Sequence, residues 1–346
     1  MATDAVRRDI IVIGASAGGV ESLRTVVAEL PAGLPAAVFV ILHVAATGNS
    51  VLPSILTRAG EMPASHPEDG DPIEYGRIYV APPDRHMVVH EDTIGIQGGP
   101  KENGHRPAID PLFRSAAGHH GPRVVGVVLS GTLDDGASGL RWIKEAGGLA
   151  LVQDPDEAMY ESMPRAAIAY AHPHAIVPAA VLGRMIGEVA GTHAEQEEEA
   201  MAGVNAEDEP GHEMLDEDPQ PGRRAAFACP DCGGGLWEIE DGGLLRFRCR
   251  VGHAFSEASM LERQSDALET ALWTGLRVLE ERAALAHRLG KRLADRGSTT
   301  TAKRFERQAA EAEEHAVHLR ELLESIGVTA APDPAAEQSE TVEKAR

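Results

Sequence analysis

The residues best suited to chemistry form the segment Gly14-Ala15-Ser16-Ala17-Gly18, a G-x-S-x-G pattern. An apolar run at 10–13 precedes it, and a stretch with helical character at 19–29 follows it. In this context the pattern predicts a sharp strand-to-helix turn that exposes a serine hydroxyl at a sheet edge. The N–H groups at the start of the following helix could then stabilise an oxyanion. The pattern therefore indicates acyl transfer through a serine nucleophile.

The same turn allows two other interpretations. A dinucleotide-binding turn spaces its glycines as G-x-G-x-x-G, whereas the glycines here fall at 14, 18 and 19. Nucleotide binding is therefore the weaker hypothesis, and a cofactor titration tests it. A purely structural turn, in which small residues let the helix pack close to the strand, is the alternative if Ser16 has no partners.

A serine nucleophile needs a base and an acid that orients the base. His43 follows the apolar run 38–42, and Asp135 follows the run 124–129. Both residues thus lie just past the carboxyl ends of predicted strands, which meet at one edge of a parallel sheet. The chain order Ser, His, Asp differs from the Ser, Asp, His order of α/β-hydrolases, so the pattern does not indicate that fold.

The elements that must position these residues alternate along the first 190 residues. The predicted strands are 10–13, 37–42, 77–80, 123–129 and 149–152. The predicted helices are 19–29, 50–58, 111–117, 137–145 and 179–189. Because the strands are continuously apolar, they are expected to be buried on both faces. The fold class predicted is α/β, with a doubly wound, mostly parallel sheet.

Three segments resemble the catalytic domain of the bacterial chemotaxis protein-glutamate methylesterases. They are 13–19 for the nucleophile, Leu42-His43-Val44 for the histidine, and 129–136 for the aspartate. The resemblance continues through 80–86, 105–110 and 162–167, and so covers about residues 9–189. Two departures stand at the site: Ala17 replaces a common threonine, and Thr132-Leu133 replaces a common methionine-glycine pair. They affect the expected substrate fit and oxyanion site.

The resemblance implies that Ser16 is the nucleophile, His43 the base, and Asp135 the group that orients His43. It implies hydrolysis of glutamyl γ-methyl esters on a methylated receptor or other signalling protein, with release of methanol and no catalytic cofactor. Glutamine deamidation is compatible with the same site, because both substrates pass through a similar tetrahedral oxyanion. A non-catalytic scaffold that binds receptors is the alternative from another class.

Other polar residues have a weaker interpretation. The loop residues His86, His105, Arg106 and Arg165 are expected near the cleft, where they either position the substrate or are solvated. His119 and His120 are expected on the surface.

The three cysteines of the chain lie close together, in two knuckles that sixteen residues separate. Cys229 and Cys232 form C-x2-C, and Cys249 with His253 forms C-x3-H. Three thiolates and an imidazole predict a tetrahedral zinc site, which is structural because four protein ligands close it. A segment of roughly thirty residues also has too small a core to fold alone. Free buried thiols are the alternative to this zinc-ribbon-like module.

Changes of composition predict five parts. They are a catalytic domain at 1–190, an acidic disordered linker at 191–224, the zinc-ribbon-like module at 225–256, a helical hairpin at 257–328 and a flexible tail at 329–346. Two apolar stripes predict the hairpin, and they could pack on each other or on another chain. The stripes are Leu261, Leu268, Leu272, Leu276 and Leu279, then Phe305, Ala309, Ala312, Ala316, Leu319 and Leu323.

Net charge and hydropathy limit the classes of partner expected for this chain. The formal charge of -22, from 54 acidic and 32 basic residues, disfavours nucleic acid. No apolar run predicts a leader or a membrane span, so a cytoplasmic protein without membrane insertion is expected. Only nine residues precede the first predicted strand. The receiver domain usual in the family is therefore not expected, and the C-terminal module is expected to recruit the receptor, a sensor kinase or a methyltransferase.

Overall fold

The computed structural model describes residues 6–44, 46, 50–190, 193–194, 222–241 and 243–325. Internal contacts divide the chain into two units, Met1–Leu261 and Glu262–Arg346. The first unit holds both the predicted catalytic domain and the predicted zinc-ribbon-like module. None of the described helices is long and apolar enough to cross a membrane.

Seven strands form the central sheet, in the order β10-β9-β8-β2-β3-β5-β4, and every pairing in it is parallel. The strands are β2 (Ile10–Ala15), β3 (Ala37–Leu42), β4 (Ala64–Ser65), β5 (Ile78–Val80), β8 (Val124–Val128), β9 (Leu149–Gln153) and β10 (Ala175–Val177). All residues of β2, β3 and β8 are buried, since their apolar side chains project alternately to both faces. The predicted parallel α/β sheet is confirmed.

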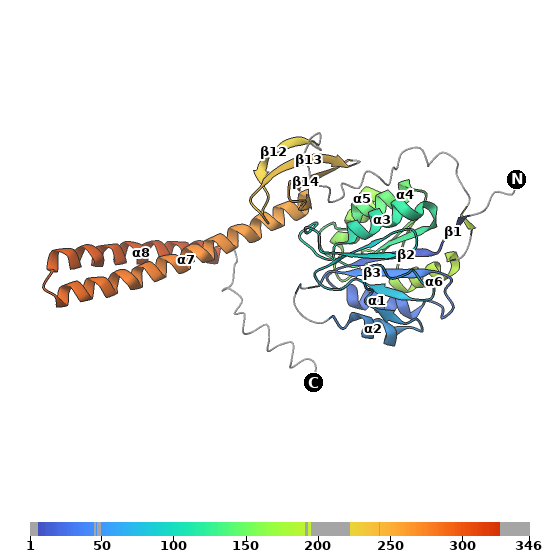
Figure 1. Ribbon diagram of the computed structural model, residues 1–346, viewed down its shortest axis with the longest axis horizontal. Coiled ribbons are helices and arrows are strands. Elements are labelled where there is room, and N and C mark those ends of the chain that lie inside the picture. The colour runs from blue at the N-terminus through green and yellow to red at the C-terminus, as the bar shows by residue number, and fades with distance from the viewer. Residues whose placement is uncertain are drawn as a thin grey trace. The chain divides into compact units, whose positions relative to one another are not determined.

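Helices cover both faces of this sheet (Figure 1). One layer contains α3 (Ile109–His120), α4 (Ala137–Glu145) and α5 (Ser162–Ala171), and the other contains α1 (Gly19–Ala28), α2 (Leu52–Ala59) and α6 (Ala179–Val189). Strand β2 shows how two cores arise from one strand. Ile10 and Val12 pack in the first core, and Ile11 and Ile13 pack in the second.

Several short elements were not predicted as strands or helices. They are β4, β10, the antiparallel pair β6 (His86–Val89) and β7 (Ile94–Gln97), the one-turn helix η1 (Gly121–Arg123), and α5. Most are too short to show a hydrophobic period, and α5 buries mainly small residues.

The predicted acidic linker begins differently from the expectation. Strand β11 (His193–Ala194) pairs antiparallel with β1 (Val6–Arg7), so a short strand lies near the start of the predicted linker. The rest of the predicted linker up to residue 221 and the predicted tail lie outside the described residues.

The module that contains the cysteines is a small antiparallel sheet with the order β12-β13-β14-β15. Its strands are β12 (Arg223–Ala228), β13 (Gly235–Asp241), β14 (Leu244–Cys249) and β15 (Ala254–Ser256). Its core has only six buried residues, Cys229, Leu236, Phe247, Cys249, Phe255 and Met260. So small a core depends on further links, either within the module or to its neighbours.

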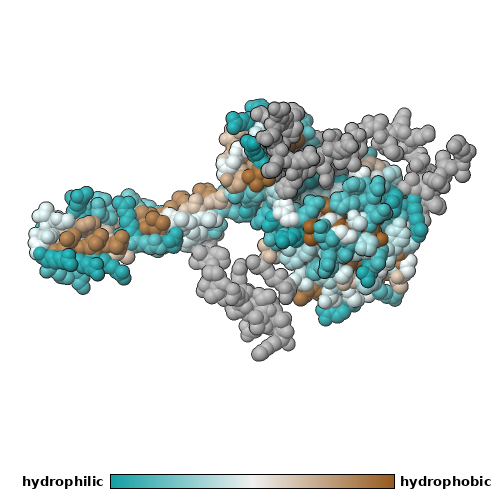
Figure 2. Space-filling model, viewed as in Figure 1, coloured by the Kyte–Doolittle hydropathy of each residue, from teal (hydrophilic) through white to brown (hydrophobic). Residues whose placement is uncertain are grey.

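Two long helices, α7 (Glu257–Asp295) and α8 (Thr299–Ser325), form the predicted hairpin. Their shared core includes Leu276, Ala316 and Leu323. Most of the two predicted stripes therefore pack on each other. Leu261 and Leu268 are 68% and 57% exposed, however, and Figure 2 shows hydrophobic surface along the hairpin.

Candidate active site

Ser16, His43 and Asp135 lie together just past the carboxyl ends of β2, β3 and β8. The His43 Nε2 lies 2.8 Å from Oδ2 of Asp135, and the His43 Nδ1 lies 3.0 Å from Oγ of Ser16. A carboxylate only accepts hydrogen bonds, so Nε2 carries the proton. Nδ1 is then the acceptor that faces the serine hydroxyl. The structure thus brings the three predicted residues into the arrangement that a base-activated nucleophile requires.

The two glycines of the G-x-S-x-G turn lie where a side chain would not fit. Gly18 has φ +70°, and a Cβ there would lie 2.8 Å from both the Ser130 Oγ and the Met159 Cβ. A Cβ on Gly14 would lie 2.5 Å from the Ile109 side chain. The small residues therefore bring the nucleophile turn close to α3 and to the loop after β8.

The backbone of the turn limits where an oxyanion could bind. The Ser16 N–H donates to the Ser130 carbonyl at 2.9 Å, and the Gly19 N–H donates to the Ser16 carbonyl at 2.9 Å. The remaining donors of the turn are the N–H groups of Ala17 and Gly18, at the start of α1. These are the donors best placed for an oxyanion formed at Ser16.

Asp135 is 2% exposed and is held from several sides. Its Oδ2 accepts the Ile109 N–H at 2.7 Å, at the start of α3, and its Oδ1 accepts the Asn103 Nδ2 at 2.9 Å. Burial would raise the pKa of Asp135, but the hydrogen bond and charge of His43 and the Ile109 N–H hold the pKa well below its usual range. Asp135 therefore stays ionised and can orient His43.

Asn103 was not predicted from the sequence. A single asparagine in a loop carries no chemical pattern, and its partner Asp135 lies 32 residues away along the chain. Only the folded structure identifies it as a contact of Asp135.

The loop location expected for four residues near the cleft is right for His105 and Arg106 and wrong for the other two. His86 begins β6 and Arg165 lies in α5. The His105 ring stacks on the His43 ring, with centroids 3.7 Å apart. His86 is buried, with Nε2 2.9 Å from the Pro100 carbonyl. Arg106 donates to Asp84, and Arg165 donates to Glu161. Of the four, His105 is therefore the one that contacts the predicted base.

The predicted surface location is confirmed for His119 and wrong for His120. His119 is exposed, but His120 is 5% exposed and its Nε2 lies 2.9 Å from the His90 carbonyl. His120 is the last residue of α3, and the loop between β6 and β7 covers it. The prediction failed because these two strands were not predicted.

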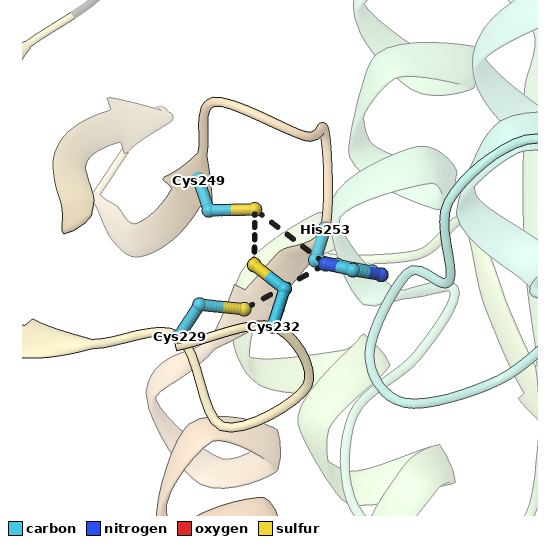
Figure 3. A group of neighbouring side chains, drawn as sticks. All are labelled: Cys229, Cys232, Cys249 and His253. Carbon is cyan, nitrogen blue, oxygen red and sulfur yellow. Dashed lines mark hydrogen bonds between the residues drawn. The ribbon is translucent and has the colours of Figure 1, made fainter. Parts of the chain in front are cut away.

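The predicted metal ligands also come together (Figure 3). The ligand atoms of Cys229, Cys232, Cys249 and His253, the Cys3His cluster, lie within 4.8 Å of one another. The Cys232 and Cys249 sulfurs are 3.7 Å apart, and the His253 Nδ1 lies 3.5 Å from the Cys249 sulfur and 3.7 Å from the Cys229 sulfur. A tetrahedral zinc ion, with Zn–S of about 2.3 Å and Zn–N of about 2.0 Å, requires edges of about 3.5–3.8 Å. The donor set and its spacing therefore fit zinc.

Known proteins are similar to this chain over the domain that carries Ser16. A protein-glutamate methylesterase/protein-glutamine glutaminase of Anaeromyxobacter dehalogenans is 36% identical over 185 residues, 54% of this chain and 54% of the relative. A putative one of Leptospira interrogans is 38% identical over 161 residues, 46% of this chain and 83% of the relative. The chain thus spans about half the length of some relatives and most of others.

Structure comparison points to the same domain. The Thermotoga maritima CheB methylesterase catalytic domain aligns with a TM-score of 0.52 and 28% identity, over 54% of this chain and 100% of that one. The family model described as CheB methylesterase matches residues 11–186, which include Ser16, His43 and Asp135. Since this match covers half of the sequence, the chain belongs to the CheB methylesterase family.

Proposed function

We propose that this chain is a serine esterase that hydrolyses glutamyl γ-methyl esters on a signalling receptor protein and releases methanol. The observation that carries the proposal is the hydrogen-bonded series Ser16, His43 and Asp135 on a domain of the CheB methylesterase family. The relatives named protein-glutamate methylesterase supply the substrate class.

The geometry supports a two-step acyl transfer. The His43 Nδ1 takes the Ser16 proton as Oγ attacks the ester carbonyl, and the N–H groups of Ala17 and Gly18 stabilise the oxyanion. His43 then protonates the departing methoxide, which leaves as methanol. Water, deprotonated by His43, attacks the acyl-enzyme, and the glutamate side chain is freed as His43 returns the proton to the Ser16 Oγ. Asp135 keeps the proton on Nε2 and stabilises the imidazolium between these transfers.

Glutamine deamidation would follow the same route. The amide of glutamine presents a similar carbonyl to Ser16, and His43 would protonate the amide nitrogen, which leaves as ammonia instead of methanol. The names of the relatives include protein-glutamine glutaminase, which supports this second substrate.

We also propose that the Cys3His cluster binds a structural Zn²⁺ ion. Its four protein ligands would close the coordination sphere, so the ion would stabilise the module and take no part in ester hydrolysis. Metal analysis of the purified protein should find about one zinc per chain, and a Cys232→Ser variant should retain much less.

The esterase proposal is tested by methanol release from a methylated receptor, together with mapping of a fluorophosphonate probe. Wild-type protein should release methanol and be labelled at Ser16. Ser16→Ala should abolish the labelling and lower the rate by at least about 10³-fold, whereas Ser54→Ala, an exposed serine on α2, should match wild type. Receptor binding without methanol release or labelling would instead favour the scaffold alternative.

A further inference from the structure

The Cys3His module, residues 222–241 and 243–261, is joined to the loop that supports Asp135. The Asn103 N–H donates to the Ala254 carbonyl at 2.8 Å, and the Ala254 N–H donates to the Lys101 carbonyl at 3.3 Å. Glu102 forms a parallel bridge with Ala254. A loop of the catalytic domain thus pairs with β15, the edge strand of the module.

The side chain of Asn103 connects the module to Asp135. Its Nδ2 donates to Oδ1 of Asp135 at 2.9 Å. Its Oδ1 accepts the Ser256 N–H at 3.0 Å and the Ser259 hydroxyl at 3.2 Å. Because Asp135 only accepts and the Ser256 N–H only donates, these contacts fix the orientation of the amide. Asn103 also has φ +50°, a conformation that asparagine tolerates better than most residues.

A second connection runs through a buried ion pair. Asp110 is 2% exposed. Its Oδ1 accepts the N–H of Gly136, the residue after Asp135, and the N–H of Gly139 in the first turn of α4. The Nη1 of Arg246, on β14 of the module, lies 3.0 Å from the Asp110 Oδ2. The module therefore supplies the counter-ion of a buried carboxylate that holds the turn around Asp135.

The Cys3His cluster lies next to both connections in the sequence of the module. Cys249 ends β14, three residues after Arg246, and His253 directly precedes β15. The Cys249 N–H donates to the His253 carbonyl at 3.0 Å. A metal ion held by these two ligands would fix the ends of the strands that carry Arg246 and Ser256.

A module that only recruited a partner would not need this junction. Asn103, Ser256 and Ser259 are all at least 93% buried, and their polar groups are paired across it. Withdrawal of the module would leave the side-chain Oδ1 of Asn103 without its donors and the Asp110 carboxylate without Arg246. If these groups stayed buried without their partners, the loss would be strongly unfavourable. The contacts therefore indicate a joint catalytic assembly.

We propose that the Cys3His module is a working part of the esterase site, in which metal binding holds Arg246, Ser256 and Ser259 as positioning residues for Asp135. Arg246 acts through Asp110, and Ser256 and Ser259 act through Asn103. The catalytic consequence rests on the proposed esterase function, but the structural coupling does not.

The first test uses variants of the full chain. Asn103→Gly keeps the left-handed backbone and removes the amide, and Arg246→Met removes the charge at similar length. Both should lower kcat and the rate of Ser16 labelling at least about tenfold, with KM changed less than about threefold, because orientation of the base is lost while substrate contacts remain. Arg246→Lys should recover part of the rate. Arg224→Met, at an exposed position on β12, is the matched control and should equal wild type.

Two results of these assays would overturn the proposal. One is a kcat within twofold of wild type in folded Asn103→Gly and Arg246→Met proteins. The other is an Arg246→Lys rate no better than that of Arg246→Met, which would indicate a general loss of stability.

The second test measures no activity. Hydrogen exchange is compared in zinc-loaded wild type, in chelated wild type and in Cys232→Ser. Loss of metal should increase exchange at residues 101–112 together with β15. Unchanged protection at 101–112 while the module exchanges freely would refute the coupling, even if the variants above fail to fold. Absence of methanol release from wild type would refute the proposed function alone.

Discussion

At the scale of single residues, the site contains three neighbouring aspartates whose pKa values are shifted in different directions. Asp135 stays ionised because His43 and backbone N–H groups outweigh its burial. Burial raises the pKa of Asp110 even though Arg246 opposes this effect. Burial, with smaller contributions from Asp110 and Asp135, raises the pKa of Asp134 to about 6. The Ser256 hydroxyl donates to Asp134 at 2.7 Å and partly offsets the rise. The charge of Asp134 therefore costs the fold stability near neutral pH.

Stability should depend on pH through Asp134. Its pKa in the folded protein, about 6, exceeds the ordinary value of 3.8, so folding favours the protonated form. The cost is absent below about pH 4, grows as pH rises, and is complete above about pH 6. Asp134→Asn keeps an oxygen acceptor for Ser256 and removes the charge. It should raise the free energy of unfolding by up to about 3 kcal/mol at pH 7.5, and by much less at pH 4.5.

Urea unfolding at the two pH values checks this expectation. Asp156→Asn, at an exposed carboxylate, serves as the control and should change stability little at either pH. A gain for Asp134→Asn that is equal at both pH values would contradict the assignment of the cost to ionisation.

At the scale of elements, the loop between β8 and α4 determines where Asp135 lies. Gly131 packs against the nucleophile turn, since a Cβ there would lie 2.9 Å from the Ser16 Cβ. Gly136 has φ +89° and precedes α4. Leu133 between them has φ +59°, a left-handed conformation that is unfavourable for a leucine. The chain carries this leucine where the resembled family commonly has glycine.

Leu133→Gly should relieve this strain. The substitution should raise the free energy of unfolding by up to about 1 kcal/mol, because glycine adopts the left-handed region without steric cost. Leu133→Asn should give a smaller gain, since asparagine tolerates this region better than leucine. Chemical denaturation of both variants measures the effect. A loss of stability in both would mean that packing of the Leu133 side chain outweighs the backbone strain.

At the scale of the whole first unit, the catalytic domain and the Cys3His module share a buried polar junction. Asp241 at the end of β13 extends it, as it accepts the Ser138 hydroxyl at 2.6 Å and the Trp142 Nε1 at 3.2 Å from α4. The junction thus reaches α4, which follows Asp135 in the chain. Stability of the module and of the catalytic domain should therefore be linked.

A double-mutant cycle measures that link. Arg246→Met should destabilise the protein by about 3–5 kcal/mol, because it leaves the Asp110 carboxylate buried without its counter-ion. Arg246→Met combined with Asp110→Asn should cost less than Arg246→Met alone, because the unpaired charge is gone. Thermal or urea unfolding of the four proteins gives the coupling free energy. Additive effects would show that Arg246 and Asp110 do not depend on each other.

The sequence predicted the parts of the site whose signals are local. The strand, turn and helix around Ser16 occupy 19 consecutive residues, from Ile10 to Ala28. His43 and Asp135 each follow an apolar run directly, so the rule for parallel sheets placed them at the same edge. The C-x2-C and C-x3-H spacing alone predicted the four metal ligands. The catalytic and metal-binding roles of these residues, like the cytoplasmic location, remain predictions.

Only the tertiary structure decided how the parts support each other. Asn103 and its partner Ser256 are 153 residues apart, and Asp110 and Arg246 are 136 residues apart. Neither pair has a periodicity or spacing that marks it, because each member is an ordinary polar residue until folding buries it opposite the other. Local patterns determined the strands, the nucleophile turn and the cysteine knuckles, since these depend on neighbouring residues. The junction between the domain and the module arises from long-range burial, and so it could be found only in the folded chain.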